Sequence, residues 1–336
     1  MGISQFGRRE WGAGLAALAL ALTGAGLARA ADPIPVTVAL SSNSLAYGGL
    51  RIAEQLGIFA KNGLAVRTVV LDSGNAATAA LISRSADFAG SGPGEVLTAR
   101  ARRQPIVIVA NIYRGFAAPI VLSKAAAEKL ADRQGAPVPD RYRALNGLVI
   151  AVPSATSALL APVRASLEAA GGSAKFVYMA QPAMIPSLET GAVQGIVASS
   201  PFWSAPVLKG SGVLWLDAPH GEIMPGNEPA SSAVLQTRED YAQARPDVIA
   251  KVRASFAELA RAIAANPSGA LAALRKAYPN VDPDALKLVF DHDASNWTRP
   301  VLSPEDVEQE KKLLKRSVDV PGLDEIAPAA VLLPSG

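Results

Sequence analysis

The sequence contains no cysteine, which excludes disulfide bridges, thiolate metal sites and cysteine nucleophiles. A lipoprotein anchor is excluded as well, because that modification needs a cysteine directly after the cleavage point of an export signal. Histidine is scarce, with only His220 and His292 among 336 residues. The sequence also lacks the G-x-S-x-G, H-E-x-x-H and Walker patterns of serine hydrolases, zinc peptidases and P-loop nucleotide hydrolases. These absences disfavour several classes of enzyme.

The two histidines stand in unrelated contexts along the chain. His292 lies between Asp291 and Asp293, but three consecutive residues cannot all face one ion from a helix. We therefore expect neither a metal site nor a cofactor. Long runs of Lys and Arg are also missing, apart from a basic cluster on one late helix. This distribution gives no reason to expect a nucleic-acid partner.

Residues 1–30 have the layout of a cleavable export signal. Arg8 and Arg9 form its positive start, a Leu- and Ala-rich stretch extends to Leu27, and Ala28-Arg29-Ala30 offers a cleavage site. The apolar stretch is shorter than the ~20 residues that span a membrane. Without this segment the net charge falls from +3 to +1. The arginine pair leaves both the twin-arginine and the general export route open, and we expect a periplasmic protein without a lipid tether.

The remaining chain alternates apolar strands with helices. Short β-branched runs at 36–40, 66–71 and 106–110 predict strands, and the first two are separated by a helix that Gly57 ends. A polar stretch at 131–143 predicts a surface excursion, after which a second unit begins with a strand at 148–152. Two βα-rich units followed by helices predict an α/β architecture with two lobes.

Later elements of the chain are predicted in the same way. Strands are expected at 176–179, 195–198, 213–216 and 231–236, and a helix at 246–265. Pro162 predicts an irregular first turn in a helix that follows the 148–152 strand. The last clear helix begins with Ser303 as its N-cap and ends with basic side chains, including Lys311, that we expect to be solvated.

Three segments of the sequence carry a family resemblance. They are Ala53-Glu54-Gln55-Leu56-Gly57-Ile58-Phe59, Ala86-Asp87-Phe88-Ala89, and Leu145-Asn146-Gly147 running into Val149-Ile150-Ala151-Val152-Pro153. In this order they resemble the solute-binding proteins for nitrate, sulfonate and taurine. The resemblance implies the periplasmic binding protein type II fold, in which two α/β lobes joined by two crossing strands close over a ligand. It implies a first lobe at 34–114 plus 224–330 and a second lobe at 115–223.

The sequence departs from this family at three positions. Gln194 replaces a usual acid, and Arg84 replaces a usual glycine. Ser200 precedes Pro201 where many relatives have a glutamate. A carboxylate that could pair with a ligand ammonium is therefore missing there, which counts against an amino-sulfonate ligand.

Hydroxyl-rich loops follow four of the predicted strands. In open α/β sheets, ligands bind beyond the carboxyl ends of the strands, where helix N-termini offer free N–H groups. Helix capping explains any single loop of this kind, but four loops at one edge predict a cleft. Its candidate ligand contacts are Ser42, Asn43, Tyr47, Ser73, Gly74, Ser91, Gly92, Ser154, Thr156 and Ser157.

Further candidates follow the strongest strand and precede a later helix. Arg114, next to Tyr113, could pair bidentately with a carboxylate or sulfonate, or it could be a surface arginine beside the hinge. Phe202 and Trp203 could form an aromatic wall or simply pack in the core. Asp87 is expected to be structural.

The expected function is that of a monomeric periplasmic binding protein without catalytic activity. It would deliver a small anionic ligand, such as a sulfonate, nitrate or a carboxylate, to an ABC permease and its ATPase. One alternative is an enzyme on the same fold, either pyrimidine-forming, which the lack of Cys disfavours, or a dehydratase built from Ser and Asn. The other alternative is a ligand-sensing subunit that docks on a receptor.

Overall fold

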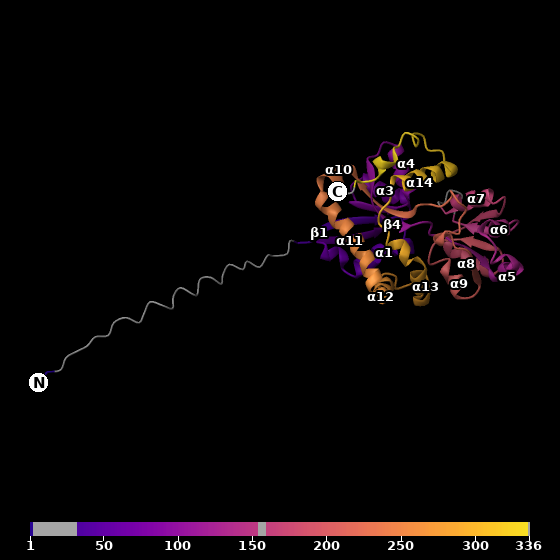
Figure 1. Cartoon of the computed structure of the whole chain (residues 1–336), viewed down its shortest axis with the longest axis horizontal. Helices are drawn as coiled ribbons and strands as arrows, with labels where there is room; N and C mark the ends of the chain where they lie inside the picture. The colour runs from indigo at the N-terminus through magenta and orange to yellow at the C-terminus, as the bar shows by residue number, and fades with distance from the viewer. Residues whose placement is uncertain (3–31, 154–158, 335–336) are drawn as a thin grey trace. The chain divides into compact units, whose positions relative to one another are not determined.

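A computed structural model describes residues 1–2, 32–153 and 159–334 (Figure 1). The predicted export signal therefore lies almost wholly outside the described residues. Among the helices that are described, none is long and apolar enough to cross a membrane.

The first lobe is built on a five-stranded sheet with the strand order β2-β1-β3-β10-β4. β10 runs antiparallel to both of its neighbours, whereas β1 pairs with β2 and β3 in parallel. The strands are β1 (Ile34–Leu40), β2 (Leu64–Val70), β3 (Phe88–Ser91), β4 (Ile106–Arg114) and β10 (Ser231–Arg238). β4 is the strand with the strongest sequence signal, and all of its residues except Arg114 are buried.

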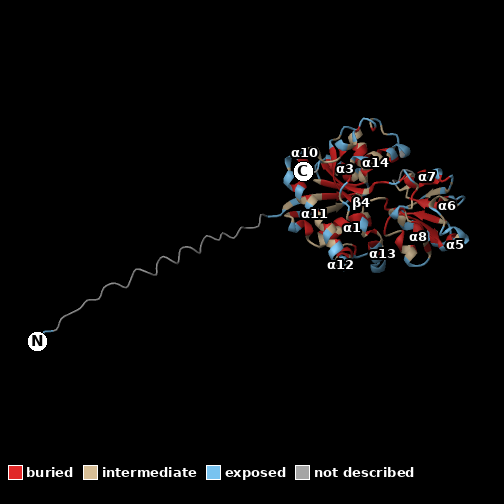
Figure 2. Ribbon diagram, in the orientation of Figure 1, coloured by how far each residue is buried: buried red, intermediate tan, exposed pale blue. Residues whose placement is uncertain are grey.

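Helices cover both faces of this sheet, which places its strands in the core (Figure 2). Alternate residues of a strand point to opposite faces. Val38 and Leu40 accordingly pack with α1, α11 and α12, whereas Ala39 packs with α3, α4 and α14. These helices are α1 (Gly48–Gln55), α3 (Gly74–Ile82), α4 (Pro93–Ala101), α11 (Pro246–Ala265), α12 (Pro267–Ala277) and α14 (Pro304–Ser317). The remaining elements of the lobe are η1 (Leu45–Tyr47), α2 (Ile58–Lys61), α10 (Glu239–Ala244), α13 (Pro283–Asp293), η4 (Ala294–Trp297) and η5 (Pro328–Val331).

The second lobe repeats the sheet design on a smaller scale, with the strand order β7-β6-β8-β5-β9. Its antiparallel strand is β5, which lies between β8 and β9. The strands are β5 (Ile120–Ser123), β6 (Val149–Val152), β7 (Lys175–Tyr178), β8 (Gly195–Val197) and β9 (Gly212–Leu216). The helices are α5 (Lys124–Lys129), η2 (Ala131–Arg133), α6 (Val138–Arg143), α7 (Leu160–Ala169), α8 (Gln181–Glu189), α9 (Ser204–Leu208) and η3 (Ala218–His220).

Two connections join the lobes, as the family resemblance predicted. One leads from the end of β4 into β5, and the other leads from the end of β9 through η3 into β10. Because β5 and β10 run antiparallel to their neighbours, each of them starts at the edge where the parallel strands end. Both connections therefore link the carboxyl edges of the two sheets, and those edges face each other.

Side-chain and backbone hydrogen bonds tie the two connections together. Ser232 Oγ accepts a hydrogen bond from Ala117 N and donates one to Gly115 O, both at 2.8 Å. Gly115 has a φ of 77°, a left-handed conformation that favours glycine. The chain is thus turned and held at the point where it passes between the lobes.

The structure corrects several sequence predictions. The strand β5 was missed, because four buried residues are too few to show a period. The predicted excursion at 131–143 does lie largely at the surface, but it contains α6, whose Tyr142 is fully buried. Pro162 is the third residue of α7, where its missing N–H would have no helical partner, so the helix needs no irregular turn.

Lys311 is a further correction, because it is not solvated. It is only 6% exposed, and its Nζ donates to Ile326 O at 2.6 Å. The predicted start of the same helix is confirmed, with Ser303 and Asp306 forming a reciprocal capping box. Arg84, the replacement for a usual glycine, has a φ of 65°, so it adopts the conformation for which glycine is preferred.

Candidate ligand-binding site

The predicted loops of the first lobe lie at the carboxyl edge of its sheet, facing the second lobe. Ser44 caps η1, and its Oγ accepts from Ala46 N at 3.2 Å. Ser73 caps α3, and its Oγ accepts from Ala76 N at 3.1 Å. Capping therefore uses these hydroxyl oxygens as acceptors. The N–H groups of η1 already have acceptors, so the donors at this edge are the hydroxyl groups and the first turn of α3.

The candidate contacts in these loops differ in their accessibility. Ser42, Asn43, Ser73, Gly74 and Gly92 keep some or much of their surface exposed. Their placement at one edge agrees with the predicted cleft, and their contact with a ligand stays a prediction.

Tyr47 and Ser91 are instead turned into the lobe. Tyr47 is 4% exposed, and its hydroxyl hydrogen-bonds with Ser41 Oγ at 2.6 Å and donates to Gly90 O at 3.1 Å. Ser91 is fully buried, and its Oγ accepts from Gln236 Nε2 at 2.6 Å. In the described conformation both hydroxyls stabilise the sheet edge, so a ligand contact from them would need a rearrangement. Asp87 is structural as predicted, since its Oδ2 accepts from Thr37 N at 2.8 Å.

Glu95, in the first turn of α4, was not recognised as a site residue from the sequence. Its carboxylate lies between two of the predicted loops, because a Cβ built on Gly74 would clash with Glu95 Oε1 and one on Gly92 would lie 2.8 Å from Oε2. Burial raises the pKa of Glu95. The available signal was a glutamate three residues after Gly92, a loop glycine that proves to be the N-cap of α4. The first lobe thus carries a carboxylate at this edge, whereas the sequence-based argument against an amino-sulfonate ligand concerned the position before Pro201 in the second lobe and stays a prediction.

Arg114 has a partner within the protein. Its Nη1 and Nη2 donate to Asp306 Oδ2 and Oδ1 at 2.8 and 2.7 Å, which is the bidentate geometry that was predicted for a ligand anion. Burial raises the pKa of Asp306, but the hydrogen bonds from Arg114 and from Ser303 more than offset this effect and lower it. Arg114 therefore joins the end of β4 to the start of α14 in this structure.

The second lobe contributes Phe202 and Trp203 at the facing edge. Phe202 is partly buried, whereas Trp203 is 1% exposed and donates from its indole nitrogen to Ser200 Oγ. Leu45 N, in the first lobe, lies 3.4 Å from Ser200 O, so the loops of the two lobes touch here. Trp203 is a core residue, and an aromatic wall from Phe202 stays a prediction. Ser154, Thr156 and Ser157 lie outside the described residues.

Tyr113 belongs to a buried polar network near the same contact. Its ring is fully buried, and its hydroxyl accepts from Asn296 Nδ2 at 3.1 Å. Burial and the adjacent Asp293 carboxylate raise the pKa of Tyr113 well above its ordinary value. The hydroxyl is thus neutral and held in place rather than directed to solvent.

His220 and His292 lie together, contrary to the sequence-based expectation. Their ring centroids are 4.3 Å apart, and the His292 ring lies 4.9 Å from that of Trp203. Burial lowers the pKa of His292, but the carboxylates of Asp217 and Asp293 outweigh this effect and raise the pKa to about 9. His292 comes from α13 of the first lobe and Asp217 from the end of β9, so this cluster also links the lobes.

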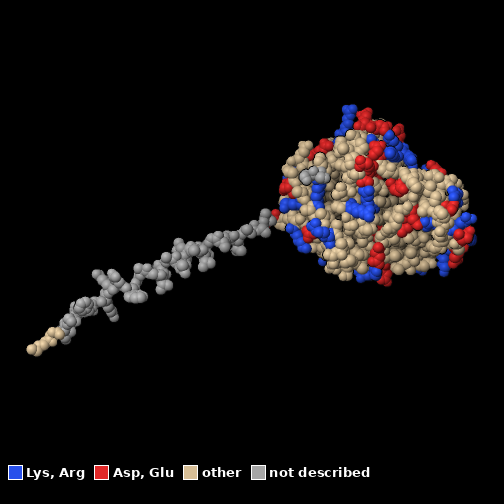
Figure 3. Space-filling view, viewed as in Figure 1, with Lys and Arg blue, Asp and Glu red and all other residues tan. Residues whose placement is uncertain are grey.

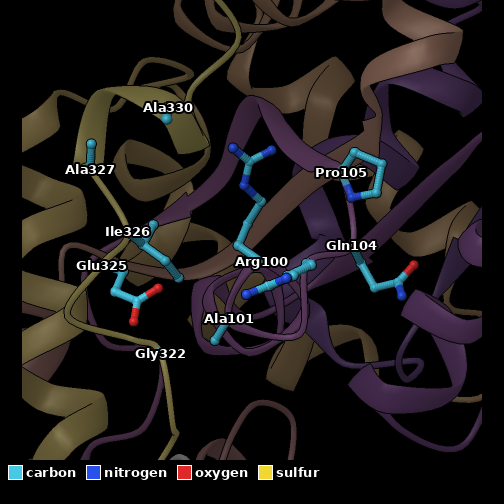
Figure 4. A pocket seen from close by; sticks show the side chains of 10 residues that line it. Arg100, Ala101, Gln104, Pro105, Gly322, Glu325, Ile326, Ala327 and Ala330 are labelled. Atoms are coloured by element: carbon cyan, nitrogen blue, oxygen red, sulfur yellow. The ribbon is translucent and has the colours of Figure 1, made fainter.

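A shallow pocket of about 400 Å³ lies elsewhere in the first lobe (Figure 4). It is lined by residues that include Arg100, Gln104, Pro105, Gly322 and Glu325. Because these residues precede β4 and follow α14, the pocket lies at the opposite edge of the sheet from the predicted loops. Figure 3 shows basic and acidic side chains interspersed over the visible face, without a broad region of one sign.

Comparisons with known proteins agree with this architecture. The alkanesulfonate-binding protein SsuA from Xanthomonas axonopodis pv. citri is similar, with a TM-score of 0.64 and 18% identity over 90% of this chain and 99% of that chain. The aliphatic sulphonate binding protein SsuA from Escherichia coli has a TM-score of 0.66 and 16% identity over 88% of this chain and 97% of that chain. The nitrate-binding protein NrtA from Synechocystis PCC 6803 has a TM-score of 0.55 and 14% identity over 84% of this chain and 80% of that chain.

At these identities the similarity shows the fold, which is the two-lobed periplasmic binding protein fold that the sequence predicted. No match is found among the curated proteins. The model of the NMT1-like family, however, matches residues 30–275, which is most of the chain. With the fold and the family match in agreement, the chain belongs to the NMT1-like family.

Proposed function

We propose that this chain is the periplasmic solute-binding component of an ABC importer. The observation that carries the proposal is the topology: two connections join two sheets whose carboxyl edges, with their helix N-termini, face each other. Ligands of open α/β sheets bind at such edges, and a hinge between the lobes would close over the ligand. The similar structures named for sulfonate and nitrate binding support the same reading.

The proposed ligand is a small molecule with an oxyanion, such as a sulfonate, nitrate or a carboxylate. Since Arg114 is paired with Asp306, we propose that hydroxyl and backbone N–H donors hold this oxyanion. The main donors would be Ser42, which follows β1, and Ser73 with the N-terminus of α3. Glu95 would accept a hydrogen bond from a donor group elsewhere on the ligand.

The proposal includes the remaining features that the resemblance implied. The lobe boundaries would be 34–114 plus 224–330 and 115–223, and the protein would act as a monomer. Its partner would be an inner-membrane permease with its ATPase. Export by the predicted signal at 1–30 would place it in the periplasm.

A thermal-shift screen of sulfonates, nitrate, aromatic carboxylates and amino-substituted analogues tests the proposal. A ligand that binds only the folded state raises the melting temperature, and at 100 times its dissociation constant it adds about 2.7 kcal/mol of stability. We expect at least one class to stabilise the protein and to be recovered unchanged by mass spectrometry. Conversion of the ligand into a product would instead identify an enzyme and would overturn the proposal.

The site is tested with the best ligand from the screen. Ser73→Ala should weaken binding by about 1 kcal/mol or more, because it removes a donor at the helix start. Ser83→Ala, at the other end of α3, is the matched control and should leave affinity unchanged. Equal affinity of both variants, measured by calorimetry, would place the ligand elsewhere.

A further inference from the structure

A cluster of metal-ligating side chains joins the two lobes. Asp217 and His220 follow β9 of the second lobe, whereas His292 lies in the last turn of α13 of the first lobe. One ligand atom from each residue lies within 4.8 Å of the others. His220 Nδ1 is 2.9 Å from Asp217 Oδ2, and His292 Nε2 is 3.0 Å from Asp217 Oδ1. The carboxylate of Asp217 therefore lies between the two imidazoles, with its two oxygens each close to one of them.

Two atoms of this cluster are buried without a hydrogen-bond partner among the described residues. They are Asp217 Oδ1 and His292 Nε2, which approach each other closely but are not aligned as a hydrogen bond. Buried polar atoms in proteins are normally paired. A carboxylate oxygen and an imidazole nitrogen that face the same point without a hydrogen bond would both be satisfied by a cation.

Asp293 stands behind His292 in the position of an outer carboxylate. Its Oδ1 hydrogen-bonds with His292 Nδ1, and Asp293 itself is 1% exposed. A histidine that binds a metal typically donates its other ring N–H to a carboxylate, which fixes the tautomer and leaves the first nitrogen free for the ion. His292 is held in this way, with Nε2 directed at Asp217.

The donor set suits a transition metal of the zinc class. Zinc binds imidazole nitrogen and carboxylate oxygen at about 2.0–2.2 Å, commonly with three protein ligands and one solvent position. Asp217 offers a carboxylate to the ion, and because the pKa of His292 is about 9, metal binding would displace the proton of this imidazole. Asp291, the other acid beside His292, is exposed and pairs with Lys287, so it takes no part.

We propose that Asp217, His220 and His292 bind one divalent ion of the zinc class, with Asp293 positioning His292. Because the ligands come from both lobes, the bound ion would tie the lobes together in the contact seen here. The inference does not depend on the proposed function, since it concerns a different set of residues.

Calorimetric titration of the untagged, chelator-treated protein with Zn²⁺ tests the proposal. We expect one ion per chain, and Co²⁺ should give the visible absorption of a low-coordinate site with nitrogen and oxygen ligands. The chain has two histidines and no cysteine, so a site of this kind depends on these residues. Absence of stoichiometric binding would overturn the proposal and would identify the cluster as an ion pair only.

Three variants rank the roles within the site. His220→Ala, at an exposed position, should weaken Zn²⁺ binding more than about 100-fold, and Asp293→Asn should weaken it about 10–100-fold, as outer carboxylates do. Asp291→Asn is the matched control on the same helix and should bind as the unmodified protein does. Binding that is unchanged by His220→Ala in a folded protein, checked by circular dichroism, would also contradict the site.

Discussion

The two lobes share one sheet design but are built on different scales. Each sheet places its first parallel strand, β1 or β6, second in the order and its antiparallel strand, β10 or β5, fourth. The first lobe has strands of up to nine residues, whereas the longest strand of the second lobe has five. The first lobe also receives all of the helices that follow β10. The same topology thus supports a larger, doubly covered lobe and a smaller one.

The C-terminal helices of the first lobe account for the polar contacts that sequence reasoning missed. α13 supplies His292 to the second lobe's Asp217, and α14 supplies Asp306 to Arg114. The second lobe has its own arginine pair, between Arg141 and Glu222 near the end of β9. The comparison suggests that the added helices stabilise the first lobe and adjust the contact between lobes.

The largest effect is expected from removing a buried tryptophan from each lobe, which tests whether the two lobes unfold together. Trp297 in the first lobe and Trp215 in the second are each 1% exposed. Trp297→Ala and Trp215→Ala should each cost about 3–5 kcal/mol in the free energy of unfolding. One hydrophobic cluster contains residues of both lobes, such as Ile112 and Ile196, so we expect both variants to shift a single urea transition.

Two separable transitions, with each tryptophan variant shifting only one of them, would show that the lobes are independent. Phenylalanine variants sharpen the comparison. Trp215 Nε1 donates to Arg141 O at 3.1 Å, whereas Trp297 Nε1 is buried without a partner among the described residues. Trp215→Phe should therefore destabilise the protein more than Trp297→Phe.

The next effect concerns Glu310 of α14, an element without a counterpart in the second lobe. Its Oε1 accepts from Ser231 N at 3.0 Å, and burial raises its pKa from 4.5 to about 7. The folded protein then keeps a proton that the unfolded chain releases. Stability from this group is complete below pH 4.5 and is lost as the pH rises to about 7. The loss is of the order of 3 kcal/mol.

The measurement is the free energy of unfolding in urea for the unmodified protein and for Glu310→Gln. The pH is varied from about 4 to about 8, a range that includes both pKa values. The glutamine keeps an acceptor for Ser231 N but cannot ionise. We expect the stability of the variant relative to that of the unmodified protein to increase as the pH rises. A difference that does not change with pH would show that Glu310 titrates normally.

The smallest effect on stability is expected from breaking the two arginine–carboxylate pairs, one in each lobe. Arg141 Nη1 donates to both Glu222 Oε2 and Trp215 O at 2.8 Å, and its side chain is 11% exposed against 31% for Arg114. Arg141→Ala should therefore cost about 2–3 kcal/mol and Arg114→Ala about 1–2 kcal/mol. Chemical denaturation of both variants measures the difference.

Ligand affinity separates two roles for Arg114. If Asp306 is its lasting partner, Arg114→Ala should leave the affinity for a ligand unchanged. If the ligand takes over the arginine, Arg114→Ala should weaken binding by on the order of 2 kcal/mol. In that case Asp306→Ala should strengthen binding, because it frees the guanidinium group.

Much of the fold was predictable because its causes are local. Buried strands show as apolar β-branched runs, and α14 begins directly after Ser303 because that side chain caps the first turn. The loops at the carboxyl edge were predictable for the same reason, since each follows a recognisable strand. β5 escaped because it is short, and because its pairing with β8 and β9 involves segments about 75 or more residues away in the chain, too distant for local patterns to show.

The sequence by itself determined the strand and helix pattern, the family resemblance and the hydroxyl-rich edge, because these depend on neighbouring residues and on periodicity. Only the tertiary structure decided which charged groups meet. Arg114 and Asp306 are 192 positions apart, and His292 meets Asp217 across two lobes. Such contacts follow from which helices cover a sheet face and where the chain crosses between lobes. A residue's own neighbours in sequence carry no record of either choice.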